Sequence, residues 1–201
     1  MQLPLKVGGV EHQHFNLGPP DKPAIWIAII CMPIHEYLAS DMAQIEKAVE
    51  LLASAKRPII YAGGGIINSG PKASTLLREL VEMTGFPITS TLMGLGAYPA
   101  SGDKWLGMLG MHGTLEANLA MHHADLVICV GARFDDRVTG RLDGFAPRAQ
   151  VIHIDIDAAE MGKPRLPDVA GVADVKTALE QLVAQGGAGP QPFRHPAHTT
   201  S

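Results

Sequence analysis

The segment with the most chemical potential follows the apolar run 126–130 and begins Gly-Ala-Arg-Phe-Asp-Asp-Arg. Three arginines recur there at every fourth position, with two aspartates between the first two: Arg133, Asp135, Asp136, Arg137 and Arg141. The planar guanidinium group can donate two parallel hydrogen bonds, so this pattern suits recognition of a phosphate or a carboxylate. The alternative interpretation is a local lattice of Arg–Asp pairs that binds no ligand.

A glycine triplet follows another apolar run, 59–62, and consists of Gly63, Gly64 and Gly65. Glycines lack a Cβ atom, so the backbone can approach a ligand closely and its N–H groups can face a phosphate. Asn68 stands where the dinucleotide fingerprint G-x-G-x-x-G requires its last glycine, so this segment is not that fingerprint. A tight turn without a ligand explains the triplet equally well.

A long segment, 91–114, is rich in glycine and methionine. Long loops inside compact domains are usually functional, and methionine gives an adaptable apolar surface. The alternative is a meandering loop that is packed by its own side chains. His112 has no metal-ligand spacing to His122 or His123, so the sequence predicts no metal site there.

Two carboxylates, Asp155 and Asp157, follow the apolar run 151–154. Residues i and i+2 of an extended strand share a face and lie about 6.6–6.8 Å apart. A carboxylate at the end of a strand can accept hydrogen bonds from ribose-type hydroxyl groups. A helix-capping role for one of the two is an equally good interpretation.

These segments need an architecture that brings the ends of several strands together. Short apolar runs typical of buried strands cover 59–62, 87–90, 126–130 and 151–155. Helical periods alternate with them, and the residues expected to cap or open these helices are Asp41, Pro71, Thr114 and Asp174. The alternation predicts an α/β fold with a doubly wound, mainly parallel sheet and helices on both faces, similar to a Rossmann domain. Ligands of such sheets bind beyond the carboxyl ends of the strands, where all these segments lie.

The two ends of the chain differ in composition from its middle. Residues 1–40 hold five of the 15 prolines and show no sustained period, and residues 186–201 are typical of a flexible tail. We therefore predict an atypical N-terminal segment over 1–40, a compact domain over 41–185 and a tail over 186–201. The apolar run 24–32 is shorter than the about 20 residues that span a membrane, and we interpret it as a short buried or mis-assigned strand.

The composition excludes several classes of function. The 201 residues include 16 Lys and Arg against 20 Asp and Glu, and the resulting charge of −4 and pI near 6.1 argue against a nucleic-acid partner. Apolar residues make up 46% and charged residues 18%, which is typical of a globular protein. Cys31 and Cys129 are too few for a disulfide framework, so we expect reduced thiols and a cytoplasmic protein. No secretory signal or membrane span is expected, and hence no membrane partner.

Several strings together resemble one enzyme family: YAGGGIINSG, GFPITSTLMGLGAYPASG, WLGMLGMHGT, ADLVICVGARFDDRVTGRL and VIHIDID. Over about residues 43–183 the chain resembles the central, FAD-binding domain of the acetolactate synthase (acetohydroxyacid synthase) catalytic subunit. The resemblance implies a parent enzyme that uses thiamine diphosphate and magnesium. Such enzymes decarboxylate pyruvate and condense the two-carbon unit with a second 2-ketoacid, at the start of branched-chain amino-acid synthesis. A homo-oligomer with a regulatory subunit is implied for the parent, and its FAD is mainly structural.

The resemblance also implies roles for individual residues of this chain. Cofactor contacts are implied at Gly63, Gly64, Gly65, Thr91, Leu92, Met93, Met111, His112, Gly131, Arg133, Val138, Asp155 and Asp174. Met111 and His112 match positions that line the space between the flavin and the active-site channel. Asp136 and Arg137 match positions at that channel, where the arginine is implied to hold the carboxylate of the acceptor ketoacid.

The chain also departs from the family pattern. No thiamine-activating glutamate domain precedes the segment, no G-D-G…N diphosphate motif follows it, and Ala158 replaces the usual proline after I-D-I-D. We therefore expect a truncated central domain that is inactive alone. The alternatives are a non-catalytic nucleotide-binding module and the same domain of another thiamine-diphosphate carboligase, such as glyoxylate carboligase or sulfoacetaldehyde acetyltransferase.

Overall fold

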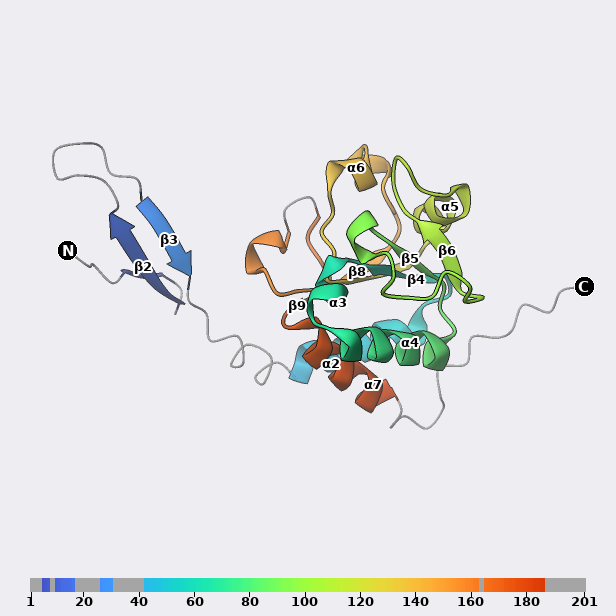
Figure 1. Cartoon of the computed structure of the whole chain (residues 1–201), viewed down its shortest axis with the longest axis horizontal. Helices are drawn as coiled ribbons and strands as arrows, with labels where there is room; N and C mark the ends of the chain where they lie inside the picture. The colour runs from blue at the N-terminus through green and yellow to red at the C-terminus, as the bar shows by residue number, and fades with distance from the viewer. Residues whose placement is uncertain (1–4, 8–9, 17–25, 31–41, 163–164, 187–201) are drawn as a thin grey trace, which may run out of the picture. The chain divides into compact units, whose positions relative to one another are not determined.

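The computed structural model describes residues 5–7, 10–16, 26–30, 42–162 and 165–186. The chain divides into two compact units, Met1–Glu36 and Tyr37–Ser201 (Figure 1). Cys31, the expected cap Asp41 and the expected tail beyond residue 186 lie outside the described residues.

The first unit contains an antiparallel sheet with the strand order β1-β2-β3. Its strands are β1 (Leu5–Val7), β2 (Val10–Asn16) and β3 (Trp26–Ile30). In the central strand, His12 pairs with Leu5 on one side and with Ile30 on the other. Strand β3 lies inside the apolar run 24–32, so that run does form a strand. The first 40 residues therefore contain regular structure although their sequence shows no sustained period.

In the second unit, the described residues form a parallel sheet with the order β6-β5-β4-β7-β8-β9. The strands are β4 (Pro58–Ala62), β5 (Ile88–Ser90), β6 (Trp105–Met108), β7 (Leu126–Val130), β8 (Gln150–Asp155) and β9 (Val169–Val172). The helices are α2 (Met42–Ser54), α3 (Gly64–Asn68), α4 (Pro71–Thr84), α5 (Leu115–His123), α6 (Asp136–Thr139) and α7 (Val175–Gly186). The predicted α/β fold with a parallel, doubly wound sheet is confirmed.

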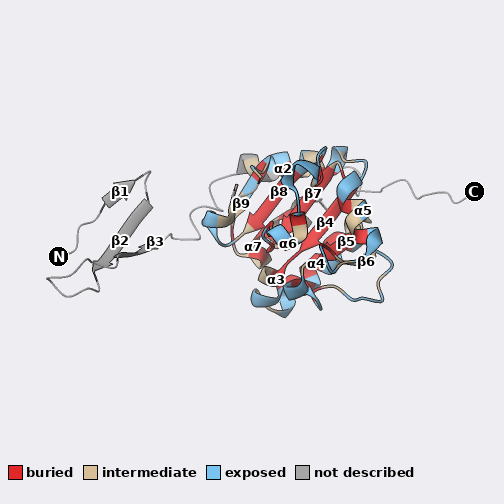
Figure 2. Ribbon diagram, turned by 90° about the horizontal axis from the view of Figure 1, so that it is seen from above, coloured by how far each residue is buried: buried red, intermediate tan, exposed pale blue. Residues whose placement is uncertain are grey.

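Both faces of this sheet are buried, which explains the uninterrupted apolar runs of its central strands (Figure 2). Successive residues of a strand point to opposite faces. Ile60 and Ile128 accordingly belong to the core under α2, α4 and α7, whereas Ile59 and Val127 belong to the core under α5. Figure 1 shows α2, α4 and α7 on one side of the sheet and α5 and α6 on the other.

Local chemistry sets the helix ends that the sequence predicted. Pro71 occupies the first turn of α4, and Gly85 ends that helix with a φ of 70°, a conformation that favours glycine. The side chain of Thr114 accepts a hydrogen bond from the Ala117 N–H and so caps α5. Asp174 caps α7 by accepting a hydrogen bond of 3.0 Å from the Lys176 N–H.

The sequence analysis missed both edge strands, β6 and β9. Strand β6 lies inside the segment 91–114, which we expected to be a loop, and its Gly107 has a φ of 92° that breaks the strand pattern. Strand β9 is a four-residue edge strand without an alternating pattern. The glycine turn after β4 is likewise more regular than expected, because Gly64 and Gly65 open the short helix α3. No described helix is both long and apolar enough to cross a membrane.

Candidate functional site

The loops that follow four neighbouring strands, β5, β4, β7 and β8, enclose a cleft of about 580 Å³ at the carboxyl edge of the sheet. This is the position where open α/β sheets bind ligands, and the size is typical of a small-molecule site. Its lining residues are Tyr61, Gly64, Gly65, Ile67, Asn68, Thr91, Leu92, Met93, Gly131, Ala132, Arg133, Asp135, Arg137, Val138, Asp155, Asp157 and Glu160.

The glycine triplet after β4 packs against the loop after β7. A Cβ atom on Gly63 would lie 2.0 Å from the carbonyl oxygen of Gly131, and one on Gly65 would lie 2.7 Å from the Gly131 Cα. Two of the three glycines are therefore required by contact between protein segments. A Cβ atom on Gly64 would lie 3.0 Å from the Met93 Cβ and 3.4 Å from the Met93 carbonyl oxygen, which is a less severe contact. Gly64 and Gly65 line the cleft, but Gly63 does not.

The loop after β5 supplies the apolar wall of the cleft. The Thr91 N–H donates to the Ala62 carbonyl at 2.9 Å, and the Thr91 side chain accepts from the Gly94 N–H at 3.0 Å, which opens the 3-10 turn Leu92–Gly94. This turn leaves the side chains of Leu92 and Met93 exposed at the cleft, with Met93 75% accessible. Large apolar side chains held in water favour a ligand with an apolar surface.

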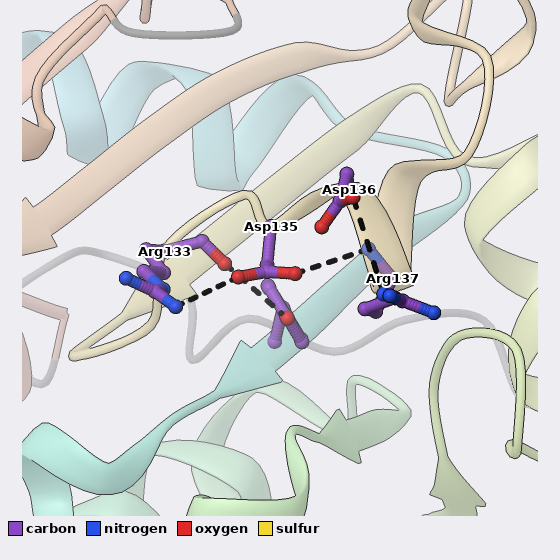
Figure 3. Close-up of polar contacts among 5 residues, drawn as sticks. Arg133, Asp135, Asp136 and Arg137 are labelled. Carbon is purple, nitrogen blue, oxygen red and sulfur yellow. Dashed lines mark hydrogen bonds and ion pairs between the residues drawn. The ribbon is translucent and has the colours of Figure 1, made fainter.

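The arginine segment after β7 places Asp135 between two cations (Figure 3). Arg133 Nη2 lies 2.8 Å from Asp135 Oδ2, and Asp135 Oδ1 accepts from the Arg137 N–H at 3.0 Å, which caps α6. These hydrogen bonds, the one from the Arg137 backbone first, lower the pKa of Asp135. The local Arg–Asp lattice therefore exists, but it does not exclude ligand binding.

The two guanidinium groups of the cleft differ in how strongly the protein holds them. Arg133 is fixed by Asp135, whereas Arg137 reaches Asp136 at only 4.0 Å and is 75% exposed. Figure 3 shows the two groups pointing away from each other on opposite sides of Asp135. They can therefore bind two separate anionic groups.

The carboxylates after β8 combine the two roles that the sequence left open. Asp155 Oδ1 accepts from the Asp157 N–H at 2.9 Å, and Asp157 caps the 3-10 turn Ala158–Glu160 through the Ala159 N–H. Both aspartates nevertheless line the cleft. Each retains oxygen atoms that can accept hydrogen bonds from ligand hydroxyl groups.

Five residues that the resemblance associated with the site lie outside the cleft lining: Gly63, Met111, His112, Asp136 and Asp174. Arg141, the third arginine of the pattern after β7, also lies outside it. The Met111 N–H donates to the Arg137 carbonyl, so this loop lies beside α6 at the edge of the site. Asp174 uses one carboxylate oxygen to cap α7 and the other to accept from the Ser69 hydroxyl at 3.1 Å. Within the described part of the chain, no three His, Cys, Asp or Glu side chains gather as metal ligands.

The sequence analysis missed several cleft residues. The Tyr61 hydroxyl donates to the Arg133 carbonyl at 3.5 Å, and burial raises the pKa of this phenol well above its ordinary value. No distinctive spacing in the sequence marks four other residues of the cleft, which are Ile67, Asn68, Ala132 and Glu160. Tyr61 was detectable in principle, because it is a polar side chain next to the end of an otherwise apolar strand.

Comparisons with known proteins identify the family of the second unit. Residues 45–182 match the family described as thiamine pyrophosphate enzyme, central domain. The chain is 51% identical to acetolactate synthase 3, chloroplastic, of Brassica napus over 142 residues, which cover 71% of this chain and 21% of that protein. It is 52% identical to the acetolactate synthase large subunit of Mycobacterium tuberculosis over 141 residues, which cover 70% of this chain and 22% of that protein. The chain thus spans about a fifth of the length of these relatives.

Proposed function

This chain belongs to the family of thiamine pyrophosphate enzyme central domains, and from that premise we propose that it is the FAD-binding central domain of an acetolactate synthase. One observation carries the FAD proposal. The loops after four adjacent strands bring a glycine turn, an exposed apolar wall and a held arginine to one cleft. Seventeen residues of one unit line it, so a single domain can form the whole contact.

The chemistry of the cleft fits the parts of FAD. Arg133 suits the diphosphate, since a guanidinium can bind phosphate oxygens with two hydrogen bonds. Leu92 and Met93 present the apolar surface that the flavin ring system needs. Asp155 can accept hydrogen bonds from the hydroxyl groups of the sugar. Gly64 allows the Met93 segment, which forms the apolar wall, to approach the first turn of α3.

The residues outside the cleft lining have indirect roles in this proposal. Gly63 and Asp174 shape the loops, because one permits the contact with Gly131 and the other ties α7 to Ser69. Met111 and His112 border the path from the flavin to the reaction channel. Gly131 and Val138, by contrast, line the cleft and complete the cofactor wall that the resemblance implies.

The parent enzyme is proposed to decarboxylate pyruvate and to join the two-carbon unit to a second 2-ketoacid. Thiamine diphosphate with magnesium supplies the carbanion chemistry of that reaction. Arg137 holds the acceptor's carboxylate at the channel beside Asp136, and the high exposure of its guanidinium group supports this role. Partners of the parent are a second copy and a regulatory subunit, and we expect a cytoplasmic location.

The visible absorbance spectrum of the purified chain, followed by gel filtration on a column equilibrated with FAD, tests this function. We expect flavin absorbance above that of the column buffer to elute with the protein. We also expect the dissociation constant for FAD to exceed about 1 µM, which corresponds to a binding free energy of roughly −8 kcal/mol. The reason is that Leu92, Met93 and Arg137 face water. Absence of co-eluting flavin at saturating concentration would contradict the proposal.

A nucleotide-binding module without catalysis is the second candidate, and one observation favours it. All lining residues of the cleft lie in a single unit, so ligand binding needs no thiamine-binding region. Acetolactate formation from pyruvate by a full-length protein that carries this domain separates the two functions, because turnover supports the acetolactate synthase domain and its absence supports the binding module. We expect no turnover by the 201-residue chain with thiamine diphosphate, magnesium and FAD, because catalysis requires the reacting cofactor to be held next to its substrate.

A further inference from the structure

Three side chains beneath the cleft donate hydrogen bonds to two successive carbonyl groups of the loop that carries Arg133. Cys129 Sγ and His153 Nε2 both reach the Ala132 carbonyl oxygen, at 3.0 and 2.8 Å. The Tyr61 hydroxyl reaches the next carbonyl, that of Arg133, at 3.5 Å. The donors come from β4, β7 and β8, which are neighbours in the sheet. The rigid core of the sheet therefore holds this loop from below.

The side chain of Phe134 anchors the same loop. Its ring lies 6.1 Å from Tyr61, 5.3 Å from His153 and 5.8 Å from Phe145, measured between ring centroids. Phe134 is buried, whereas the side chain of its neighbour Arg133 is 64% exposed. The loop thus directs two carbonyl groups and one ring into the core while it presents the arginine to the cleft.

All three donors retain their protons. Burial raises the pKa of the Cys129 thiol and of the Tyr61 phenol, so neither loses the proton that it donates. Burial lowers the pKa of His153, although the hydrogen bond to the Ala132 carbonyl and the charges of Asp155 and Glu160 oppose this effect. A neutral His153 that faces a carbonyl at Nε2 must carry its proton there, because a carbonyl oxygen can only accept. Its buried Nδ1 has no hydrogen-bond partner among the described residues.

The loop needs such restraint because its first residue is conformationally permissive. Gly131 has a φ of 58°, and glycine adopts positive and negative φ about equally readily. Rotation of the following peptide groups would move the carbonyls away and leave buried donors unpaired, which is unfavourable. The Gly131 N–H donates to the Ile154 carbonyl at 2.8 Å and its carbonyl accepts from the Gly65 N–H at 2.9 Å. Together with these backbone bonds, the three donors select one conformation of the residues that follow Gly131.

We propose that Tyr61, Cys129 and His153 are positioning residues of the cleft, which hold the segment 131–135 so that Arg133 faces the phosphate groups of the ligand. Only the identity of that ligand rests on the proposed function. The positioning itself is a property of the chain without ligand, and it can be measured in that state.

Amide hydrogen exchange of the full chain without FAD tests the positioning directly. In His153→Leu, we expect exchange of the segment 130–138 to be roughly three- to tenfold faster, the factor that corresponds to one lost hydrogen bond. Cys129→Ala should accelerate the same segment, and Cys129→Ser should restore protection because a hydroxyl can donate to the Ala132 carbonyl. The control is Thr84→Val, which removes a buried bond of 2.7 Å to the Leu80 carbonyl in the last turn of α4.

The results separate this inference from the proposed function. Faster exchange in 130–138 with His153→Leu and Cys129→Ala, but not with Cys129→Ser or Thr84→Val, supports the positioning even if the wild-type chain binds no FAD. Unchanged exchange in 130–138 overturns it, even if FAD binds well. Should His153→Leu fail to fold, equal exchange in the two Cys129 variants overturns it by itself. Where FAD binds, a roughly three- to tenfold weaker affinity in Cys129→Ala than in Cys129→Ser is expected, and equal affinities overturn the link to Arg133.

Discussion

The two edges of the parallel sheet use the same kinds of residue for different purposes. At the amino edge, Asp125 accepts hydrogen bonds from the N–H groups of Lys56 and Arg57, at 2.9 and 2.8 Å, and Asp168 accepts from Val151 at 2.8 Å. At the carboxyl edge, Asp135 and Asp155 also accept backbone hydrogen bonds, but they line an open cleft with exposed cations and apolar side chains.

This difference shows that residue type alone does not identify a site. An aspartate before a strand joins neighbouring segments, whereas an aspartate after a strand lies where the loops diverge and leave space for a ligand. The amino edge should therefore control stability, and the carboxyl edge should control binding. Substitutions at each edge can confirm or break this division.

The largest expected effect is on the free energy of unfolding. It concerns Gly63, a residue of the carboxyl edge whose role is close packing. Gly63→Ala should destabilise the fold by roughly 3 kcal/mol, because its Cβ would lie 2.0 Å from the Gly131 carbonyl oxygen and the backbone must shift. Gly144→Ala is the matched control, since a Cβ there meets nothing within 4 Å. Chemical denaturation of both variants measures the difference, and equal stabilities would contradict the close-packing explanation of the triplet.

The second effect belongs to the amino edge. Asp125→Ala should lower the free energy of unfolding by about 2 kcal/mol, since two backbone N–H groups lose a charged acceptor. FAD affinity should stay within about threefold of the wild type, a change below about 1 kcal/mol. The exposed Asp103 offers a control, and Asp103→Ala should leave both quantities unchanged. A loss of affinity larger than the loss of stability would break the division between the edges.

The third prediction separates two functions within the carboxyl edge, which are FAD binding and condensation with the acceptor ketoacid. In a full-length acetolactate synthase that carries this domain, Arg137→Ala should slow condensation about ten- to a hundredfold, the effect of losing a charge-assisted pair, while flavin content stays near normal. Arg137→Lys should recover little, because lysine cannot form the bidentate pair. Steady-state kinetics with flavin quantification measures both, and a parallel loss of flavin and rate would show that Arg137 belongs to the cofactor site.

The smallest expected effect is the dependence of stability on pH. His153 has a pKa below its ordinary value in the folded state, so between the two pKa values the unfolded chain binds more protons. Stability should therefore fall as the pH drops below about 6.5, the value for an unperturbed histidine. Thermal unfolding between pH 7.5 and pH 5.5 should show a decrease of a few degrees that is absent in His153→Leu. An identical decrease in that variant would assign the effect to other groups.

The sequence predicted the parts of this fold that depend on local chemistry. Uninterrupted apolar runs predicted the strands β4 and β7. The residues Pro71 and Thr114 predicted where the helices α4 and α5 begin. Strands β6 and β9 were missed because edge strands lack a complete buried face and need no regular pattern.

For the candidate site, the sequence predicted only that the loops after several strands lie together. The resemblance associated Thr91, Leu92, Met93 and Arg133 with the cofactor, and the structure brings these residues to one cleft. The supporting contacts of Cys129 and His153 could not be predicted, because they depend on strand register. The sequence also could not show that Gly63 contacts Gly131 across the sheet edge.

The affinity of the full chain for FAD, measured by titration for the wild type and for Arg133→Ala, tests the central claim most directly. Arg141→Ala is the matched control, because Arg141 pairs with Asp143 at 2.5 Å and does not line the cleft. We expect Arg133→Ala to bind FAD about ten- to a hundredfold more weakly and Arg141→Ala to bind like the wild type. Equal affinities of the two variants would contradict the claim that the carboxyl-edge cleft binds FAD through Arg133.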